Sequence, residues 1–76
     1  MNLQQLHIVR ETAKLGFSLT AVAHSMAISQ PAVSRHLREL EQELGVPLFS
    51  RHGKRLSGLT PVGQQLLPIA NRMLDE

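Results

Sequence analysis

Residues 20–34 read TAVAHSMAISQPAVS, a pattern that predicts two helices joined by a tight turn. Ser29 is a strong N-cap residue, and Pro31 falls in the first helical turn after it, where a missing N–H costs nothing. We therefore expect a helix that starts at Gln30 and forms the second half of a helix-turn-helix at about residues 19–38.

The shorter helix before this turn is expected to begin at Thr20, a residue type that caps helix N-termini. Leu19 precedes it in the position of a hydrophobic staple, and the helix should run to about Met26. The turn has Ala27 where a helix-turn-helix often has glycine, so a positive φ at this residue would be strained by about 1 kcal/mol.

The chain before this motif also has the periodicity of a helix, as does the chain after Gln30. Asn2 suits the N-cap of the first helix, and Gly16 suits its end. The apolar residues of that helix recur at intervals of three and four: Leu3, Leu6, Val9 and Ala13. The stripe that follows Gln30 is Val33, Leu37, Leu40 and Leu44. Gly45 and Pro47 should then end the second of these helices.

Residues 48–51 and 56–59 are two short candidate strands around a glycine-containing turn, which predicts a small hairpin. Thr60 and Pro61 then repeat the cap-plus-proline pattern and open a last helix. Pro68 should bend this helix without ending it.

These elements predict a mostly α fold, a winged helix-turn-helix with a three-helix core, a short β-hairpin as the wing, and a following linker helix. Residues 1–59 would form the winged helix-turn-helix domain, with the wing at about 48–59, and residues 60–76 would begin the linker or dimerisation helix. A chain of 76 residues builds one small domain at most.

The composition limits the cellular compartment of the protein and the type of ligand it can bind. The sequence has no cysteine, no apolar run near the ~20 residues of a membrane span and no signal-peptide pattern, so a cytoplasmic, nucleoid-associated protein is expected. The formal net charge is +2, but residues 44–74 contain four cations and no acid. That segment is a positive patch of the kind that attracts nucleic acid.

The polar face of the helix from Gln30 carries side chains that suit the edges of DNA bases. Gln30 can bond bidentately to adenine, and Arg35 or Arg38 to guanine. Ser34 can bond to a base or a phosphate, and Pro31 can pack on a thymine methyl. The basic hairpin can reach a minor groove or phosphates. The candidate DNA-contacting residues are Thr20, Ser29, Gln30, Pro31, Ser34, Arg35, Arg38, Arg51, Lys54 and Arg55.

The same residues have simpler interpretations. Arginines on a helix face often only solvate it, and a basic turn is often only good surface. The four histidines show no metal-ligand spacing, and the serines have no base and orienting acid near them, so we predict no metal, no cofactor in this domain and no catalytic residue. The position of the arginines on a helix-turn-helix favours contact with DNA.

Four motifs extend over nearly the whole chain. They are Ser29-Gln30-Pro31-Ala32-Val33-Ser34, Leu40-Glu41 with Glu43-Leu44-Gly45, Leu48-Phe49 with Arg51, and Leu59-Thr60 with Gly63. In these motifs the chain resembles the LysR-type transcriptional regulators. By position, Gln30, Pro31, Ser34 and Arg35 match the major-groove readers of the family, and Arg51 matches the wing arginine directed toward the minor groove. The loop at residues 16–20 is one residue longer than in most members.

The resemblance implies sequence-specific binding of double-stranded promoter or operator DNA. It also implies a linker helix that pairs two subunits, usually within a tetramer, and a C-terminal domain that binds a small-molecule effector and is not contained in these 76 residues. Residues 3–6, 49–56 and 60–64 look like the CysB branch of the family, which controls sulfur assimilation.

The last helix has two adjacent apolar stripes, where a small domain needs only one. Their spacing averages the coiled-coil period, so one stripe can dock on the domain while the other meets a second copy. A single wide core-facing stripe is the alternative. The stripes are Val62, Leu66, Ile69 and Met73, and Gly63, Leu67, Ala70 and Leu74. The residues predicted at the dimer interface are Leu66, Leu67, Ala70, Met73 and Leu74.

Two other classes of function compete with DNA binding. A winged helix can serve as a protein–protein interaction module once its basic groove-facing residues are lost. The residues that argue against this here are Gln30, Ser34, Arg35 and Arg51. RNA binding is disfavoured because the A-form major groove is too narrow for a helix and the pattern exposes no stacking aromatics. The operator, the effector and the direction of regulation are not encoded in this segment.

Overall fold

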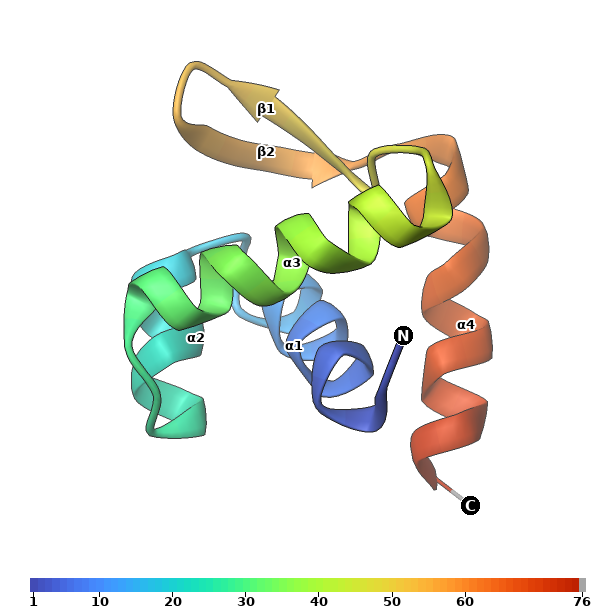
Figure 1. Cartoon of the computed structure of the whole chain (residues 1–76), viewed down its shortest axis with the longest axis horizontal. Helices are drawn as coiled ribbons and strands as arrows, with labels where there is room; N and C mark the ends of the chain where they lie inside the picture. Colours follow the sequence, from blue (N-terminus) through green and yellow to red (C-terminus); the bar gives the residue numbers. More distant parts are fainter. Residues whose placement is uncertain (76) are drawn as a thin grey trace.

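The computed structural model describes residues 1–75, which fold into four helices and one antiparallel hairpin (Figure 1). The elements are α1 (Leu3–Lys14), α2 (Leu19–Met26), α3 (Gln30–Leu44), β1 (Phe49–His52), β2 (Arg55–Leu59) and α4 (Pro61–Asp75). The mostly α winged helix-turn-helix is therefore confirmed, while the end of the expected segment 60–76, at Glu76, lies outside the described residues. None of the described helices has the length and apolar character needed to cross a membrane.

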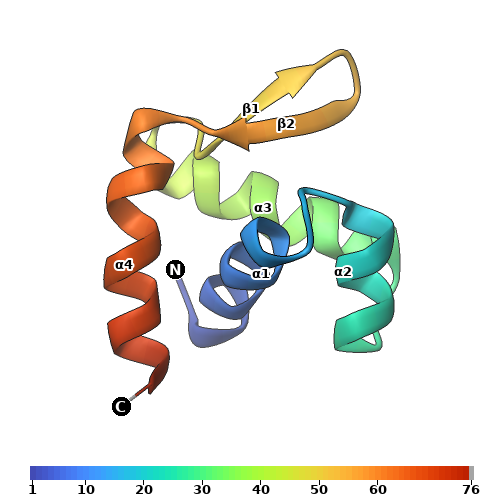
Figure 2. The same cartoon turned by 180° about the vertical axis from the view of Figure 1, so that it is seen from behind.

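The core lies between α1, α2 and α3 and under the base of the hairpin. In Figures 1 and 2, α3 crosses the molecule with α1 below it, α2 at one end and α4 at the other. The core is aliphatic apart from Phe49, whose ring meets the ring of Phe17 edge to face at a centroid distance of 6.2 Å. The buried cluster is Ile8, Val9, Val22, Ala23, Val33, Leu37, Leu40, Leu48, Phe49 and Leu56.

The predicted cap of α1 is confirmed and is reciprocal. The Asn2 side chain accepts from the Gln5 N–H at 2.8 Å, and the Gln5 side chain accepts from the Asn2 N–H at 3.2 Å. At the other end Gly16 and Phe17 both take positive φ angles, 71° and 66°, and the Phe17 N–H reaches back to the Thr12 carbonyl at 2.8 Å. This left-handed turn satisfies the last carbonyls of α1.

The start of α2 differs from the prediction. Its N-cap is Ser18, whose hydroxyl accepts from the Ala21 N–H at 3.2 Å, and Leu19 is the first helical residue. Thr20 is therefore not the cap, and Leu19 is not a staple. Both Ser18 and Thr20 are good capping types, and the left-handed turn at Phe17 decides between them because it leaves Ser18 in extended backbone at the helix entrance.

The turn into α3 forms as expected. Ala27 has φ 57° and ψ 41°, in the left-handed region, and the Ile28 N–H donates to the Ala23 carbonyl at 3.1 Å. The Ser29 hydroxyl accepts from the Ala32 N–H at 3.2 Å and caps α3. Val33, Leu37 and Leu40 are buried as predicted. Leu44 is not, because it lies in the last turn of α3, beyond the core cluster, and stays 37% exposed.

The hairpin starts one residue later than predicted. Phe49 pairs with Leu59 and His52 with Arg55, and the register shifts between Ser50 and Arg51. Leu48 remains outside the strand, because its N–H donates to the Glu41 carboxylate at 2.6 Å and its carbonyl accepts from the Thr60 N–H at 3.0 Å.

The first turn of α4 is fixed to the base of the hairpin. The Thr60 hydroxyl donates to the Pro47 carbonyl at 2.8 Å and accepts from the Gly63 N–H at 3.1 Å. Gly63 is buried so close to Leu48 that a Cβ would lie 2.2 Å from the Leu48 carbonyl oxygen. Helix α4 continues through Pro68, packs against α1, and ends where Asp75 pairs with Arg10 at 2.7 Å.

We predict that Gly63→Ala destabilises the domain by about 1–3 kcal/mol, because α4 must move away from the backbone of Leu48. Urea unfolding followed by circular dichroism measures the loss. Gly58→Ala is the control, since a Cβ at Gly58 meets nothing within 4 Å. Equal stability of the two variants would contradict the close contact.

We also predict that Ala27→Gly stabilises the chain by about 0.5–1 kcal/mol, because glycine takes the left-handed conformation without strain. Ala13→Gly, within α1, should instead destabilise it by up to about 1 kcal/mol. The thermal unfolding midpoints of the two variants should move in opposite directions, and a fall with Ala27→Gly would refute the predicted strain.

Candidate nucleic-acid interface

A groove lies between α3 and the hairpin. The hairpin stands above this helix with its tip toward α2 (Figures 1 and 2). The groove is lined by Leu19, Gln30, Ser34, Leu37, Arg38, Arg51 and Lys54. Apolar side chains from α2 and α3 form part of its lining, and amide, hydroxyl and cationic groups form the rest. The cationic part of this lining attracts an anionic molecule.

The wall formed by α3 carries side chains spaced by one helical turn. Gln30, Ser34 and Arg38 follow each other at intervals of four residues, so they lie on one face of the helix. Pro31 and Arg35 are exposed but lie outside the groove lining, on the neighbouring face. The Arg35 guanidinium lies 3.6 Å from the Glu39 carboxylate one turn later.

The wall formed by the hairpin is basic. Arg51 lies in β1 and Lys54 in the turn, and both line the groove opposite α3. A second, adjoining hollow brings Lys54 and Arg55 together with Thr20 and Gln30. The tip of the wing therefore reaches the N-terminal ends of α2 and α3.

Seven of the ten predicted DNA-contacting residues thus line two adjoining hollows. They are Thr20, Gln30, Ser34, Arg38, Arg51, Lys54 and Arg55. The structure places Ser29, Pro31 and Arg35 at the exposed margin instead. The hydroxyl of Ser29 is committed as an acceptor to the cap of α3.

The electrostatics of this face favour an anion. Five of the eight Lys and Arg residues lie on α3 or the hairpin: Arg35, Arg38, Arg51, Lys54 and Arg55. The N-terminal ends of α2 and α3 lie at the same face, where the helix dipoles add partial positive charge.

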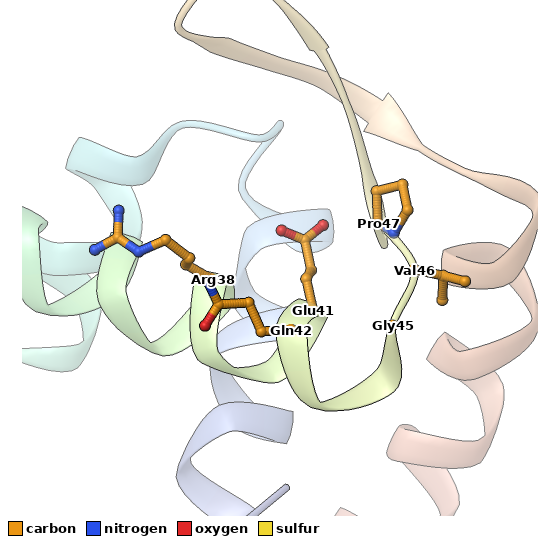
Figure 3. Close-up of a pocket in the computed structure, with 6 residues that line it drawn as sticks. All are labelled: Arg38, Glu41, Gln42, Gly45, Val46 and Pro47. Carbon is orange, nitrogen blue, oxygen red and sulfur yellow. The ribbon is translucent and has the colours of Figure 1, made fainter.

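Glu41 is a residue of this region to which the sequence analysis gave no role. Its carboxylate accepts from the Leu48 N–H at 2.6 Å and the Phe49 N–H at 3.3 Å, and it lies 3.4 Å from the Arg51 guanidinium. In Figure 3, Glu41 extends from α3 toward the chain that follows Pro47, whereas Arg38 points away from it. The sequence places Glu41 in the Leu40-Glu41 motif and three residues after Arg38, near the groove face, but indicates no contact with the wing.

The two stripes of α4 have different environments. Ala70 is fully buried and Leu67 and Leu74 are half-buried, so this stripe docks on the domain itself. The expectation that Ala70 meets a partner is corrected, because its own domain already covers it. The other stripe is half-buried at Leu66 and exposed at Val62, Ile69 and Met73, which are 39%, 43% and 51% accessible.

Comparison with known families gives a match over most of the chain. The profile of the family described as bacterial regulatory helix-turn-helix protein, lysR family, matches residues 3–64. The chain is 55% identical over 76 residues to the HTH-type transcriptional regulator cbl of Escherichia coli strain K12. It is 47% identical over 76 residues to the HTH-type transcriptional regulator CysB of Burkholderia cenocepacia. All of this chain aligns in both cases, and it spans 24% of each relative.

Solved structures show the same fold. The DNA-binding domain of CbnR in its complex with DNA superposes with a TM-score of 0.88 at 33% identity, over 99% of this chain and 84% of that one. The DNA-binding domain of BenM in complex with catB site 1 DNA gives 0.88 at 31% identity, over 99% and 82%.

Proposed function

Because the chain belongs to the LysR family of bacterial regulatory helix-turn-helix proteins, we propose that α3 and the wing together bind double-stranded operator DNA for a transcriptional regulator. The observation that carries the proposal is the single groove in which Gln30, Ser34 and Arg38 of α3 face Arg51 and Lys54 of the hairpin.

Some of these side chains contact the DNA bases, and others contact the phosphate backbone and so position the protein on the duplex. The first turns of α3 enter the major groove, where Gln30 reads adenine and Arg35 or Arg38 reads guanine. Arg35 is on the exposed face beside the groove, and its contact with Glu39 is exposed and weak, so it is free to turn toward a base. Pro31, exposed beside it, packs on a thymine methyl.

Contacts to the DNA backbone come from the ends of helices and from the wing. Thr20, Ser29 and Ser34 lie at or near the N-termini of α2 and α3, where hydroxyls and N–H groups suit phosphate oxygens. Lys54 and Arg55 at the hairpin tip bind phosphates or enter the minor groove.

Regulation of sulfur metabolism is the biological role that the relatives favour. The similar proteins include CysB of Burkholderia cenocepacia and SsuR of the same organism, at 47% identity over 76 and 74 residues. The effector that sets the activity of such a regulator is expected on a domain outside this segment, and the whole regulator acts at the chromosome in the cytoplasm.

Helix α4 supplies the surface through which two copies pair. The stripe of Val62, Leu66, Ile69 and Met73, which is half-buried at Leu66 and exposed at the other three residues, has the spacing of a coiled-coil seam, while the neighbouring stripe holds the helix on α1. Of the interface residues first expected, Leu66 and Met73 stay in this seam, and Leu67 and Leu74 border it. Paired helices would present two copies of α3 to half-sites about 34 Å apart, and two such dimers make the tetramer expected for the whole regulator.

We predict that Gln30→Ala weakens binding to a preferred duplex by about 1–3 kcal/mol and leaves binding to random duplex nearly unchanged. Lys54→Ala should weaken both duplexes similarly and lower the slope of log Kd against log salt by about 1. Fluorescence anisotropy over a salt series, on a duplex selected from a random pool by the wild-type chain, measures all of these values.

The matched control is Gln42→Ala, on the same helix but outside the groove between α3 and the hairpin, which should bind like the wild type. The proposed roles would be refuted if the affinity of the wild-type chain did not depend on salt. They would also be refuted if Gln30→Ala and Lys54→Ala each lost the same affinity for the preferred and the random duplex.

We predict that Ile69→Asp abolishes self-association, because it places a charge in the exposed seam. Gln64→Asp, exposed in the first turn of α4 and away from the seam, should leave it unchanged. Sedimentation equilibrium over a concentration series reports the mass of each variant. A wild-type chain that stays monomeric to millimolar concentration, or the same self-association in Ile69→Asp, would refute pairing through this seam.

A further inference from the structure

We propose that Glu41 is a positioning residue for DNA binding, which fixes the base of the wing to α3 and holds the Arg51 guanidinium at the groove. The proposal rests on the proposed function, because it concerns how the same groove is held ready for DNA. Glu41 itself has no role as a contact to DNA, since a carboxylate at a phosphate would be repelled.

The two oxygens of this carboxylate have different partners. Oε2 accepts from the Leu48 N–H at 2.6 Å and from the Phe49 N–H at 3.3 Å, while Oε1 lies 3.4 Å from Nη2 of Arg51. The Glu41 side chain is 13% exposed, whereas that of Arg51 is 45% exposed. Glu41 is therefore anchored in the protein, and Arg51 is the partner that can move.

The backbone contacts of Glu41 matter because a two-stranded hairpin is barely stable by itself. The hairpin enters the body of the domain through Leu48 and Phe49, whose side chains are fully buried and whose N–H groups are both held by Glu41. The wing consequently leaves α3 in a fixed direction, and its distance from Gln30 and Ser34 is set before DNA arrives.

The contact with Arg51 restricts a long side chain that would otherwise lose its rotamer freedom on binding DNA. A guanidinium that is already oriented loses less of that freedom when it meets a phosphate or a minor groove. If the Glu41 carboxylate instead mainly neutralises the charge of Arg51, removing its own charge should strengthen DNA binding. A change in DNA affinity therefore separates the two roles by its direction: weaker binding indicates positioning of Arg51, and tighter binding indicates neutralisation of it.

Glu41→Gln tests this in the 76-residue chain. The amide keeps a carbonyl oxygen for the Leu48 N–H but loses the charge that attracts Arg51. The probe is a duplex selected from random-sequence DNA by the wild-type chain. The expected result is binding about two- to fivefold weaker, the range of a partly exposed ion pair, with an unchanged thermal midpoint as the check on folding.

A double-mutant cycle provides the readout that a merely structural role would not change. With Arg51→Ala already present, Glu41→Gln should cause no further loss, because there is no guanidinium left to position. With Lys54→Ala as the matched background, the two losses should multiply, because no ion pair links Lys54 to Glu41 within residues 1–75. Losses that multiply in both backgrounds, or tighter binding by Glu41→Gln, would overturn the proposal.

Arg51→Lys keeps the experiment decisive if Glu41→Gln unfolds, because it leaves the Glu41 contacts with the backbone intact. Lysine retains the charge but not the planar guanidinium, so binding should weaken at least twofold at an unchanged salt slope. Wild-type affinity in Arg51→Lys would overturn the proposal. If the wild-type chain selects no duplex at all, the proposed function fails, which is a distinct outcome from a failed cycle.

Discussion

The backbone of Leu48 is the constraint on which the remainder of the domain depends. Its N–H is bound by Glu41 of α3, its carbonyl accepts from Thr60 at the entrance of α4, and its side chain is fully buried. Gly63 approaches the same carbonyl so closely that only a residue without a Cβ fits. Helix α3, the wing and α4 thus meet at one residue, and the position of each follows from that of the others.

The local elements could be predicted because their signals lie within a few residues. The caps at Asn2 and Ser29 follow from side-chain chemistry alone, and the tight turn before Ser29 follows from its place between two helical patterns, although the left-handed φ at Ala27 goes against the preference of alanine. The cap of α2 could not be chosen from sequence, because Ser18 and Thr20 are equivalent until the turn at Phe17 sets the path of the chain. Leu44 is exposed because the core ends before the last turn of α3. The spacing of apolar residues along the sequence does not show where the core ends.

The candidate site was predictable in composition but not in arrangement. The spacing of Gln30, Ser34 and Arg38 on one helix identifies a polar face, whereas their position opposite Lys54 results from tertiary packing. Glu41 belongs to one of the motifs that carry the family resemblance, but the motif does not show its role, because its partners are backbone N–H groups seven and eight residues away. Both stripes of α4 have the same period, so only the docking of Ala70 against the domain shows which one remains available.

The attachment of α4 at both ends has a mechanical consequence. Its first turn is wedged under Leu48, and its last turn is held to α1 by the pair of Asp75 with Arg10. Because it also packs along α1, this helix moves with the domain body rather than independently of it. In an assembly that joins two copies through α4, a rotation of the paired α4 helices would turn each domain, with its α3, as one unit. Such a rotation would change the angle between the two α3 helices, and so the spacing of the half-sites they fit. The contacts of each α3 with its own half-site would stay the same.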